Sequence, residues 1–151
     1  MSLDKCDLFQ GMSEQGRAQI ATIAVAESHP QGTTLFREND AANHLYILRE
    51  GHVRLTWGRR GLMARLLTSP GEGFGWASVA GHETYTATAE CVFPTKVLKI
   101  DKMRMGQLLE QDPVSGLQFY RRLAYLVGRR LMDCYAAMSP SQGEGDTRSY
   151  G

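Results

Sequence analysis

The sequence predicts an α+β fold that is mainly β: an antiparallel sandwich or jelly roll with one helix before it and two helices after it. Short apolar segments alternate with glycine- and proline-containing turns between about residues 33 and 100. Apolar residues at helical spacing occur before and after that region. With 151 residues, 42% of them apolar, the chain is long and apolar enough for one domain with its own core.

The N-terminal helix is predicted over residues 13–25. Ser13 is a favourable N-cap, and Ile20 and Ile23 fall on one face of the helix. Pro30 then ends the local structure.

Short strands follow, separated by turns. The segment 53–57 shows the pattern most clearly, because apolar and polar residues alternate along it. Gly58 to Gly61 is typical of a hairpin loop. Strands are expected at 33–36, 45–48, 53–57, 62–67, 84–93 and 95–100.

The most distinctive stretch runs from Gly71 to Ala89. Glycines at alternate positions allow a tight, open backbone, and residues 76–79 can form one helical turn whose free amides attract anions. A plain hairpin loop is the alternative interpretation of the same glycines.

The last third of the chain is predicted to be helical. Asp101 caps a helix that extends to about Gln111, and Asp112-Pro113 opens a longer one that extends to about Met138. The polar residues 139–151 are expected to form a disordered tail after a domain of residues 1–138. The apolar stripe of the long helix is predicted to consist of Tyr120, Leu123, Ala124, Val127 and Leu131.

Composition excludes several classes of protein. The net charge of +1 gives no overall field for nucleic acid or membrane surfaces. Three widely separated cysteines indicate a reducing, cytoplasmic environment rather than a disulfide framework or a zinc site. No segment is apolar enough for a membrane span or a signal peptide.

Several short motifs, in their order and spacing, resemble the cyclic-nucleotide-binding domain family, which includes the sensor half of bacterial catabolite-activator regulators. The resemblance covers roughly residues 9–135 and implies a small, cupin-like β-roll flanked by helices. The matching segments are Pro30-x-Gly32, Phe36, Glu38-Asn39-Asp40, Leu45-Tyr46-Ile47-Leu48, Gly51, Val53, Gly71-Glu72-Gly73-Phe74-Gly75, Ala87-x-Ala89 and Asp112-Pro113.

In that family the glycine-rich turn is the phosphate-binding cassette. The resemblance places Trp76 where the family has a glutamate for the ribose, and Tyr85 where it has an arginine for the phosphate. The ligand-binding residues that it implies are Phe74, Gly75, Trp76, Ala77, Ser78, Tyr85 and Thr86.

Losing the arginine removes a charged hydrogen bond of roughly 1.5–3 kcal/mol, so cyclic AMP binding in the usual manner is not expected. Three outcomes stay open. A cyclic nucleotide binds through backbone amides and stacking on Trp76 or Tyr85. A different, less charged small molecule binds. Or the two rings fill the pocket and leave a ligand-free scaffold.

No enzyme, metal or cofactor is predicted. His44, Glu50 and His52 lack the His-x-His pair of a metal-binding cupin and are interpreted as ordinary surface residues. Ser78 has no nearby histidine and no Gly-x-Ser-x-Gly pattern, which argues against a nucleophile. His82 is interpreted as a loop residue that can become cationic near neutral pH.

The expected function is therefore that of a stand-alone sensor that signals through its C-terminal helices to a protein partner not yet known. The alternative is an interaction module with a filled pocket. By resemblance, the helix 113–138 pairs two copies in a homodimer. Direct DNA binding is not expected, because only a short segment follows this helix. The pairs Arg121-Arg122 and Arg129-Arg130 are interpreted as one solvated face.

Overall fold

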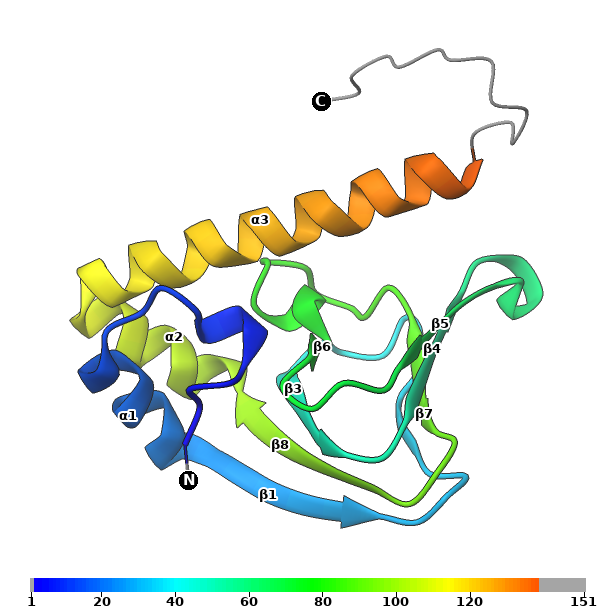
Figure 1. Cartoon of the computed structure of the whole chain (residues 1–151), viewed down its shortest axis with the longest axis horizontal. Helices are drawn as coiled ribbons and strands as arrows, with labels where there is room; N and C mark the ends of the chain where they lie inside the picture. Colours follow the sequence, from blue (N-terminus) through cyan, green and yellow to red (C-terminus); the bar gives the residue numbers. More distant parts are fainter. Residues whose placement is uncertain (1, 139–151) are drawn as a thin grey trace.

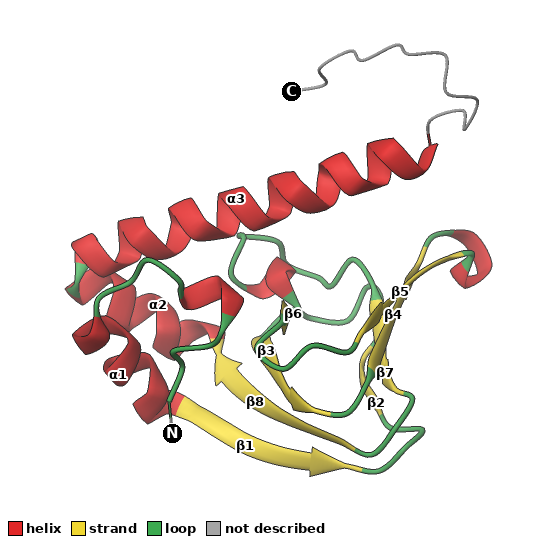
Figure 2. Cartoon of the chain, viewed as in Figure 1, coloured by secondary structure: helices red, strands yellow, loops and turns green. Residues whose placement is uncertain are grey.

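The computed structural model describes residues 2–138 and has two four-stranded antiparallel sheets with helices packed at one end (Figures 1 and 2). This architecture confirms the predicted fold class. One sheet has the order β1-β8-β3-β6 and the other the order β2-β7-β4-β5. The strands are β1 (Ala24–His29), β2 (Thr34–Phe36), β3 (His44–Glu50), β4 (Val53–Trp57), β5 (Met63–Leu67), β6 (Gly73–Phe74), β7 (Thr88–Cys91) and β8 (Thr95–Asp101).

The main helices begin at the predicted caps. The Ser13 hydroxyl accepts a hydrogen bond from the amide of Gly16, and an Asp101 carboxylate oxygen accepts one from the amide of Arg104. Asp112 performs the same role for the amide of Ser115. The α-helices are α1 (Glu14–Ile23), α2 (Lys102–Gln111) and α3 (Pro113–Met138), and three short 3₁₀ helices are η1 (Asp7–Phe9), η2 (Arg59–Gly61) and η3 (Trp76–Ser78).

Two apolar cores follow from this arrangement. The first lies between the helices and the face of the β1-β8-β3-β6 sheet that is turned away from the other sheet, and the rings of Phe9 and Phe119 meet in it with centroids 5.9 Å apart. The second lies between the two sheets and contains Phe36, Tyr46, Phe74 and Tyr85. Helix α3 lies across one side of the molecule, over the strands (Figure 1).

Two predictions about the bounds of elements are wrong. The predicted first helix includes residues 24 and 25, but these residues open β1, which pairs with β8 from Ala24–Ile100 to His29–Thr95. Pairing with a neighbouring strand overrides the local helical pattern. The strand expected at 84–93 is shorter, because only residues 88–91 join the sheet, while Thr84 makes a single bridge to Ala41.

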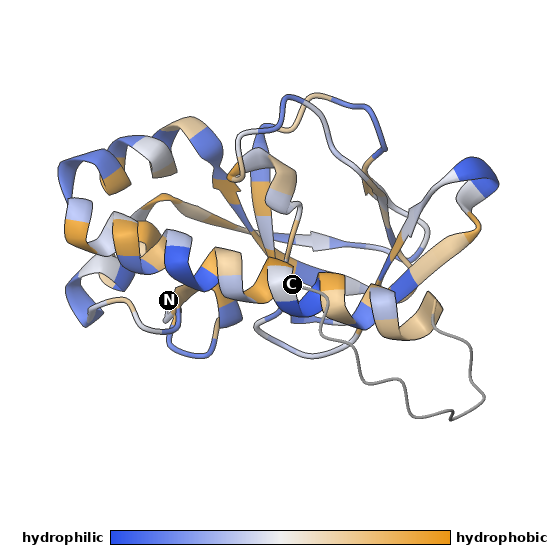
Figure 3. Cartoon of the chain, turned by 90° about the horizontal axis from the view of Figure 1, so that it is seen from above, coloured by the Kyte–Doolittle hydropathy of each residue, from blue (hydrophilic) through white to orange (hydrophobic). Residues whose placement is uncertain are grey.

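The predicted apolar stripe of α3 is mostly exposed in the single chain. Of its members only Leu123 is buried, and helix α3 instead buries the face that carries Gly116, Phe119 and Leu123. Tyr120 and Leu131 are each about half exposed. Hydrophobic bands alternate with hydrophilic ones along the visible side of α3 (Figure 3). The arginine pairs do not share one solvated face, since Arg122 and Arg130 are half-buried while Arg121 and Arg129 are exposed.

Residues 139–151, for which the sequence predicts a disordered tail, lie outside the described residues. Within residues 2–138, no helix is both long and apolar enough to cross a membrane.

Candidate functional site

The glycine-rich stretch forms a compact loop on the edge of strand β3. Strand β6 pairs with β3 through Tyr46–Phe74, and Gly75 then turns into helix η3 with φ +75°. A Cβ at Gly75 would lie 3.2 Å from the carbonyl oxygen of His44, so the close approach of the two chain segments favours glycine. The Ser78 hydroxyl donates to the carbonyl of Gly75 at 2.8 Å and closes the turn.

Tyr85, which the resemblance places at the arginine position, belongs to the core. It is 4% exposed, and its ring stacks on Phe36 with centroids 3.8 Å apart. Its hydroxyl donates to the carbonyl oxygen of His44 at 2.7 Å and accepts from the amide of His44 at 3.1 Å. Burial raises the pKa of this phenol, so Tyr85 stays neutral, and its hydroxyl is already occupied by the backbone.

Trp76, which the resemblance places at the glutamate position, is only half-buried. Its indole N–H donates to the carbonyl of Gly73 at 2.9 Å, which fixes the ring. The guanidinium of Arg130 on α3 lies over the ring, 4.3 Å from its centroid. The cassette and the long helix therefore meet through this cation–π contact.

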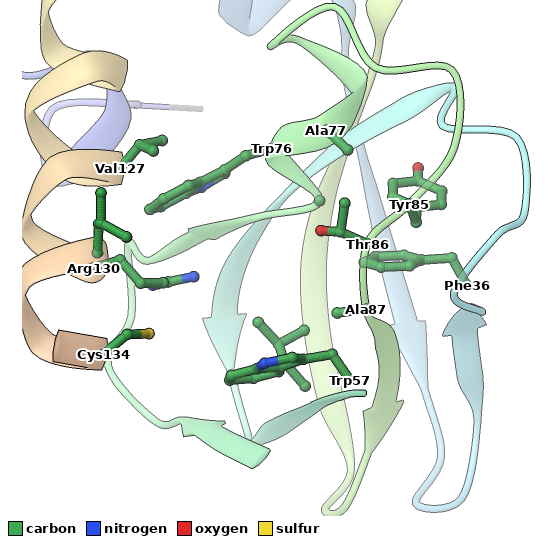
Figure 4. Close-up of a pocket in the computed structure, with 13 residues that line it drawn as sticks. Phe36, Trp57, Trp76, Ala77, Tyr85, Thr86, Ala87, Val127, Arg130 and Cys134 are labelled. Carbon is green, nitrogen blue, oxygen red and sulfur yellow. The ribbon is translucent and has the colours of Figure 1, made fainter. Parts of the chain in front are cut away.

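A cavity of about 360 Å³ opens between the β-roll, the cassette and α3. Figure 4 shows Trp76 and Trp57 on opposite sides of it, with the Arg130 side chain reaching in from the helix between them. Its lining is mainly apolar and aromatic. The lining residues are Phe36, Leu55, Trp57, Gly75, Trp76, Ala77, Tyr85, Thr86, Ala87, Val127, Arg130, Leu131 and Cys134.

The structure brings five of the seven predicted site residues to this cavity: Gly75, Trp76, Ala77, Tyr85 and Thr86. The other two do not line it. Phe74 is 1% exposed and stacks on Tyr46 in the core, and Ser78 is buried in its own turn.

Trp57 and four residues of α3, including Arg130, form part of the cavity wall that is not predicted from the sequence. The sequence pattern places Trp57 only in a strand, and Arg130 only on a polar face. The alternation of residues 53–57 puts Trp57 on the inner face, which is a usable signal. No comparable signal fixes Arg130, because its place depends on how α3 is rotated against the roll.

A second, polar cavity of about 370 Å³ also touches Trp76 and Arg130. It contains Glu72, whose pKa is raised mainly by burial, and Arg65, whose Nε is buried without a hydrogen-bond partner in residues 2–138. Burial, and then the charge of Arg65, lowers the pKa of Arg130, although a guanidinium stays charged near neutral pH.

The histidines do not form a metal site within the described residues. No group of three or more histidine, cysteine, aspartate or glutamate side chains in residues 2–138 is arranged to hold an ion. His44 lies at the start of β3, where burial lowers its pKa, and His82 is exposed in the loop after η3.

The chain is thus a β-roll whose glycine-rich cassette faces a long C-terminal helix across a pocket. Comparison with known proteins identifies the family. The family model for the cyclic nucleotide-binding domain matches residues 26–112. The chain therefore belongs to the cyclic nucleotide-binding domain family, as the resemblance indicated.

Regulators are among the relatives. The chain is 28% identical to the cyclic AMP receptor protein of Thermus thermophilus, over 83% of its own length and 57% of the relative's. It is 27% identical to the CRP-like cAMP-activated global transcriptional regulator of Mycobacterium tuberculosis, over 81% and 55%. The chain thus spans just over half the length of these two curated relatives.

Solved structures show the same fold. The Thermus thermophilus catabolite activator protein superposes with a TM-score of 0.71 at 27% identity, covering 87% of this chain and 61% of that one. A cyclic nucleotide-binding domain from Methylobacillus flagellatus gives a TM-score of 0.76 at 19% identity, covering 90% and 78%. At that identity the second likeness shows the fold alone.

Proposed function

We propose that this chain is a regulatory sensor domain that binds a small molecule in the pocket between the cassette and α3 and signals through its C-terminal helices. The observation that carries the proposal is the open cavity of about 360 Å³ at this place. A mainly apolar concave site with a few polar groups is typical of small-molecule binding. Because cassette and helix both line the cavity, a ligand there contacts both elements at once.

The alternative, a ligand-free interaction module, is favoured by one observation. Tyr85 occupies the core in place of a ligand-binding arginine. Trp76 does not fill the ligand pocket, because its ring forms one wall of a cavity that stays open. The two functions therefore make different predictions for Trp76.

Trp76→Ala is expected to abolish ligand binding while lowering the free energy of unfolding by only about 1–2 kcal/mol, because the ring is half-buried. Calorimetric titration with cyclic AMP, cyclic GMP and AMP, on the native chain and the variant, checks the binding. Micromolar binding that the variant loses would support a nucleotide sensor. A loss of several kcal/mol of stability, with no ligand heat from the native chain, would instead support the scaffold.

We also propose that α3 pairs two copies of the chain. Its outward residues repeat at alternating intervals of three and four positions, as in a coiled-coil seam. Most are exposed in this single chain, with Leu131 at 49% and Met138 at 77%. The seam consists of Leu117, Tyr120, Ala124, Val127, Leu131, Cys134 and Met138.

Ala124→Arg is expected to convert the dimer to a monomer, because it places a charge in the middle of the seam and outside the pocket lining. Met132→Arg is the matched control, since it adds the same charge to the same helix, about 80° around its axis from Ala124. Sedimentation velocity measures both variants. A native chain that is monomeric at tens of micromolar, or equal behaviour of the two variants, would contradict the seam.

A further inference from the structure

The chemistry of the pocket lining restricts the kind of ligand that fits. Among the described residues that line it, Arg130 is the only charged one, and none is a carboxylate. The rest of the lining is aromatic, aliphatic or weakly polar, and the hydroxyl of Tyr85 is already held by the backbone of His44. A bound molecule therefore meets one positive charge in otherwise apolar surroundings.

Arg130 keeps its charge available to a ligand. Within residues 2–138, none of the ion pairs shorter than 4.0 Å includes this guanidinium. The charges that act on it from neighbouring elements are Arg65, Glu72 and Asp7, of which Arg65 is repulsive. Its central carbon lies over the Trp76 ring, 4.3 Å from the centroid, and a guanidinium in such a contact still has N–H groups that can donate to a carboxylate.

Two aromatic walls flank this charge in the pocket. Trp57 and Trp76 stand on opposite sides of the cavity, with Arg130 reaching in between them (Figure 4). Aromatic walls of this kind favour flat rings, which stack on an indole or meet it edge to face. A guanidinium favours a planar carboxylate, with which it forms two parallel charged hydrogen bonds.

We propose that the ligand is a planar aromatic acid, held between Trp57 and Trp76 with its carboxylate on Arg130. The inference rests on the proposed sensor function and names its ligand class. It differs from cyclic-nucleotide recognition in two ways. The charge partner comes from α3 rather than from the cassette. The indole of Trp76 is a donor only, so it cannot accept hydrogen bonds from ribose hydroxyls as a glutamate does.

Naphthoate, naphthalene methanol and decanoate test the proposal as probes. The alcohol keeps the ring and removes the charge, and decanoate keeps the charge and removes the ring. Calorimetry on the whole chain gives the affinities. The chain has two tryptophans, and both line this cavity, so the two indole N–H resonances of the nitrogen-labelled chain report where each probe binds.

Naphthoate is expected to bind roughly tenfold or more tightly than naphthalene methanol, because only the carboxylate forms a charged hydrogen-bonded pair with Arg130. Decanoate is expected to bind more weakly than naphthoate. Arg130→Gln should reduce the preference for acid over alcohol to less than about threefold while leaving the alcohol's affinity nearly unchanged. Arg121→Gln, an exposed change on the same helix outside the pocket, is the matched control and should keep the preference.

The outcomes separate the two proposals. If the alcohol or decanoate binds as tightly as naphthoate and shifts the indole resonances, the aromatic-acid inference is wrong while the sensor proposal stands. If Arg130→Gln and Arg121→Gln lose the preference equally, Arg130 is not the charge partner. If neither these probes nor nucleotides move the indole resonances at millimolar concentration, the pocket is not a sensor site, and both proposals fail.

Discussion

Tyr85→Ala is expected to lower the free energy of unfolding by about 3–5 kcal/mol, because it removes a large ring from the core between the two sheets. The side chain is 4% exposed and stacks on Phe36. Its hydroxyl also holds both the amide and the carbonyl of His44, so the substitution leaves two backbone groups without their partner. Urea unfolding followed by tryptophan fluorescence measures the change.

Tyr85→Phe separates the ring from the hydroxyl. The phenylalanine keeps the stack on Phe36 and loses only the hydrogen bonds to His44, so we expect a loss of about 1–2 kcal/mol. If Tyr85→Ala costs less than about 1 kcal/mol, the ring is not part of the core. In that case the position would be open to a ligand, as the family's arginine is.

Phe119→Ala is expected to destabilise the chain by a similar amount, about 3–5 kcal/mol, because this ring anchors α3 to the rest of the fold. Phe119 is fully buried and packs against Phe9 of η1 with centroids 5.9 Å apart. Its loss opens a cavity at the junction of the N-terminal segment and the long helix. Urea unfolding measures the effect, at a protein concentration low enough to exclude association.

Tyr120→Ala is the matched control for Phe119→Ala. The two residues are neighbours on the same helix, but Tyr120 is 47% exposed. In the dissociated chain its replacement should change stability by less than about 1 kcal/mol. Equal losses for the two variants would mean that α3 is rotated about its axis and buries a different face.

Much of the fold can be predicted because its signals are local. Caps at Ser13, Asp101 and Asp112 fix where helices begin, and alternation fixes the strand at 53–57. Strand β1 lacks such a signal. Its apolar Val25 is 56% exposed, so pairing with β8, rather than an internal pattern, defines it.

Of the two walls of the candidate site, only the one formed by the cassette can be predicted from the sequence. The cassette is a continuous segment whose motif resembles that of the family, and this resemblance assigns Trp76 and Tyr85 to it. The opposite wall comes from α3, which begins at Pro113 and is remote from the cassette in the chain. Apolar residues occur on most sides of this helix, so composition does not reveal which face turns inward, and the sequence pattern wrongly places Arg130 in solvent.

Three residues of α3 belong to two surfaces at once. Val127, Leu131 and Cys134 line the cavity and also belong to the proposed dimer seam. If the chain has both the proposed ligand site and the proposed seam, a ligand that repositions these residues changes the surface offered to a second copy, and a second copy restrains the cavity wall in return. Thermodynamic linkage requires the two effects to be equal in size. The apparent dissociation constant of a ligand should therefore depend on protein concentration, so that cellular abundance sets the sensitivity of the response.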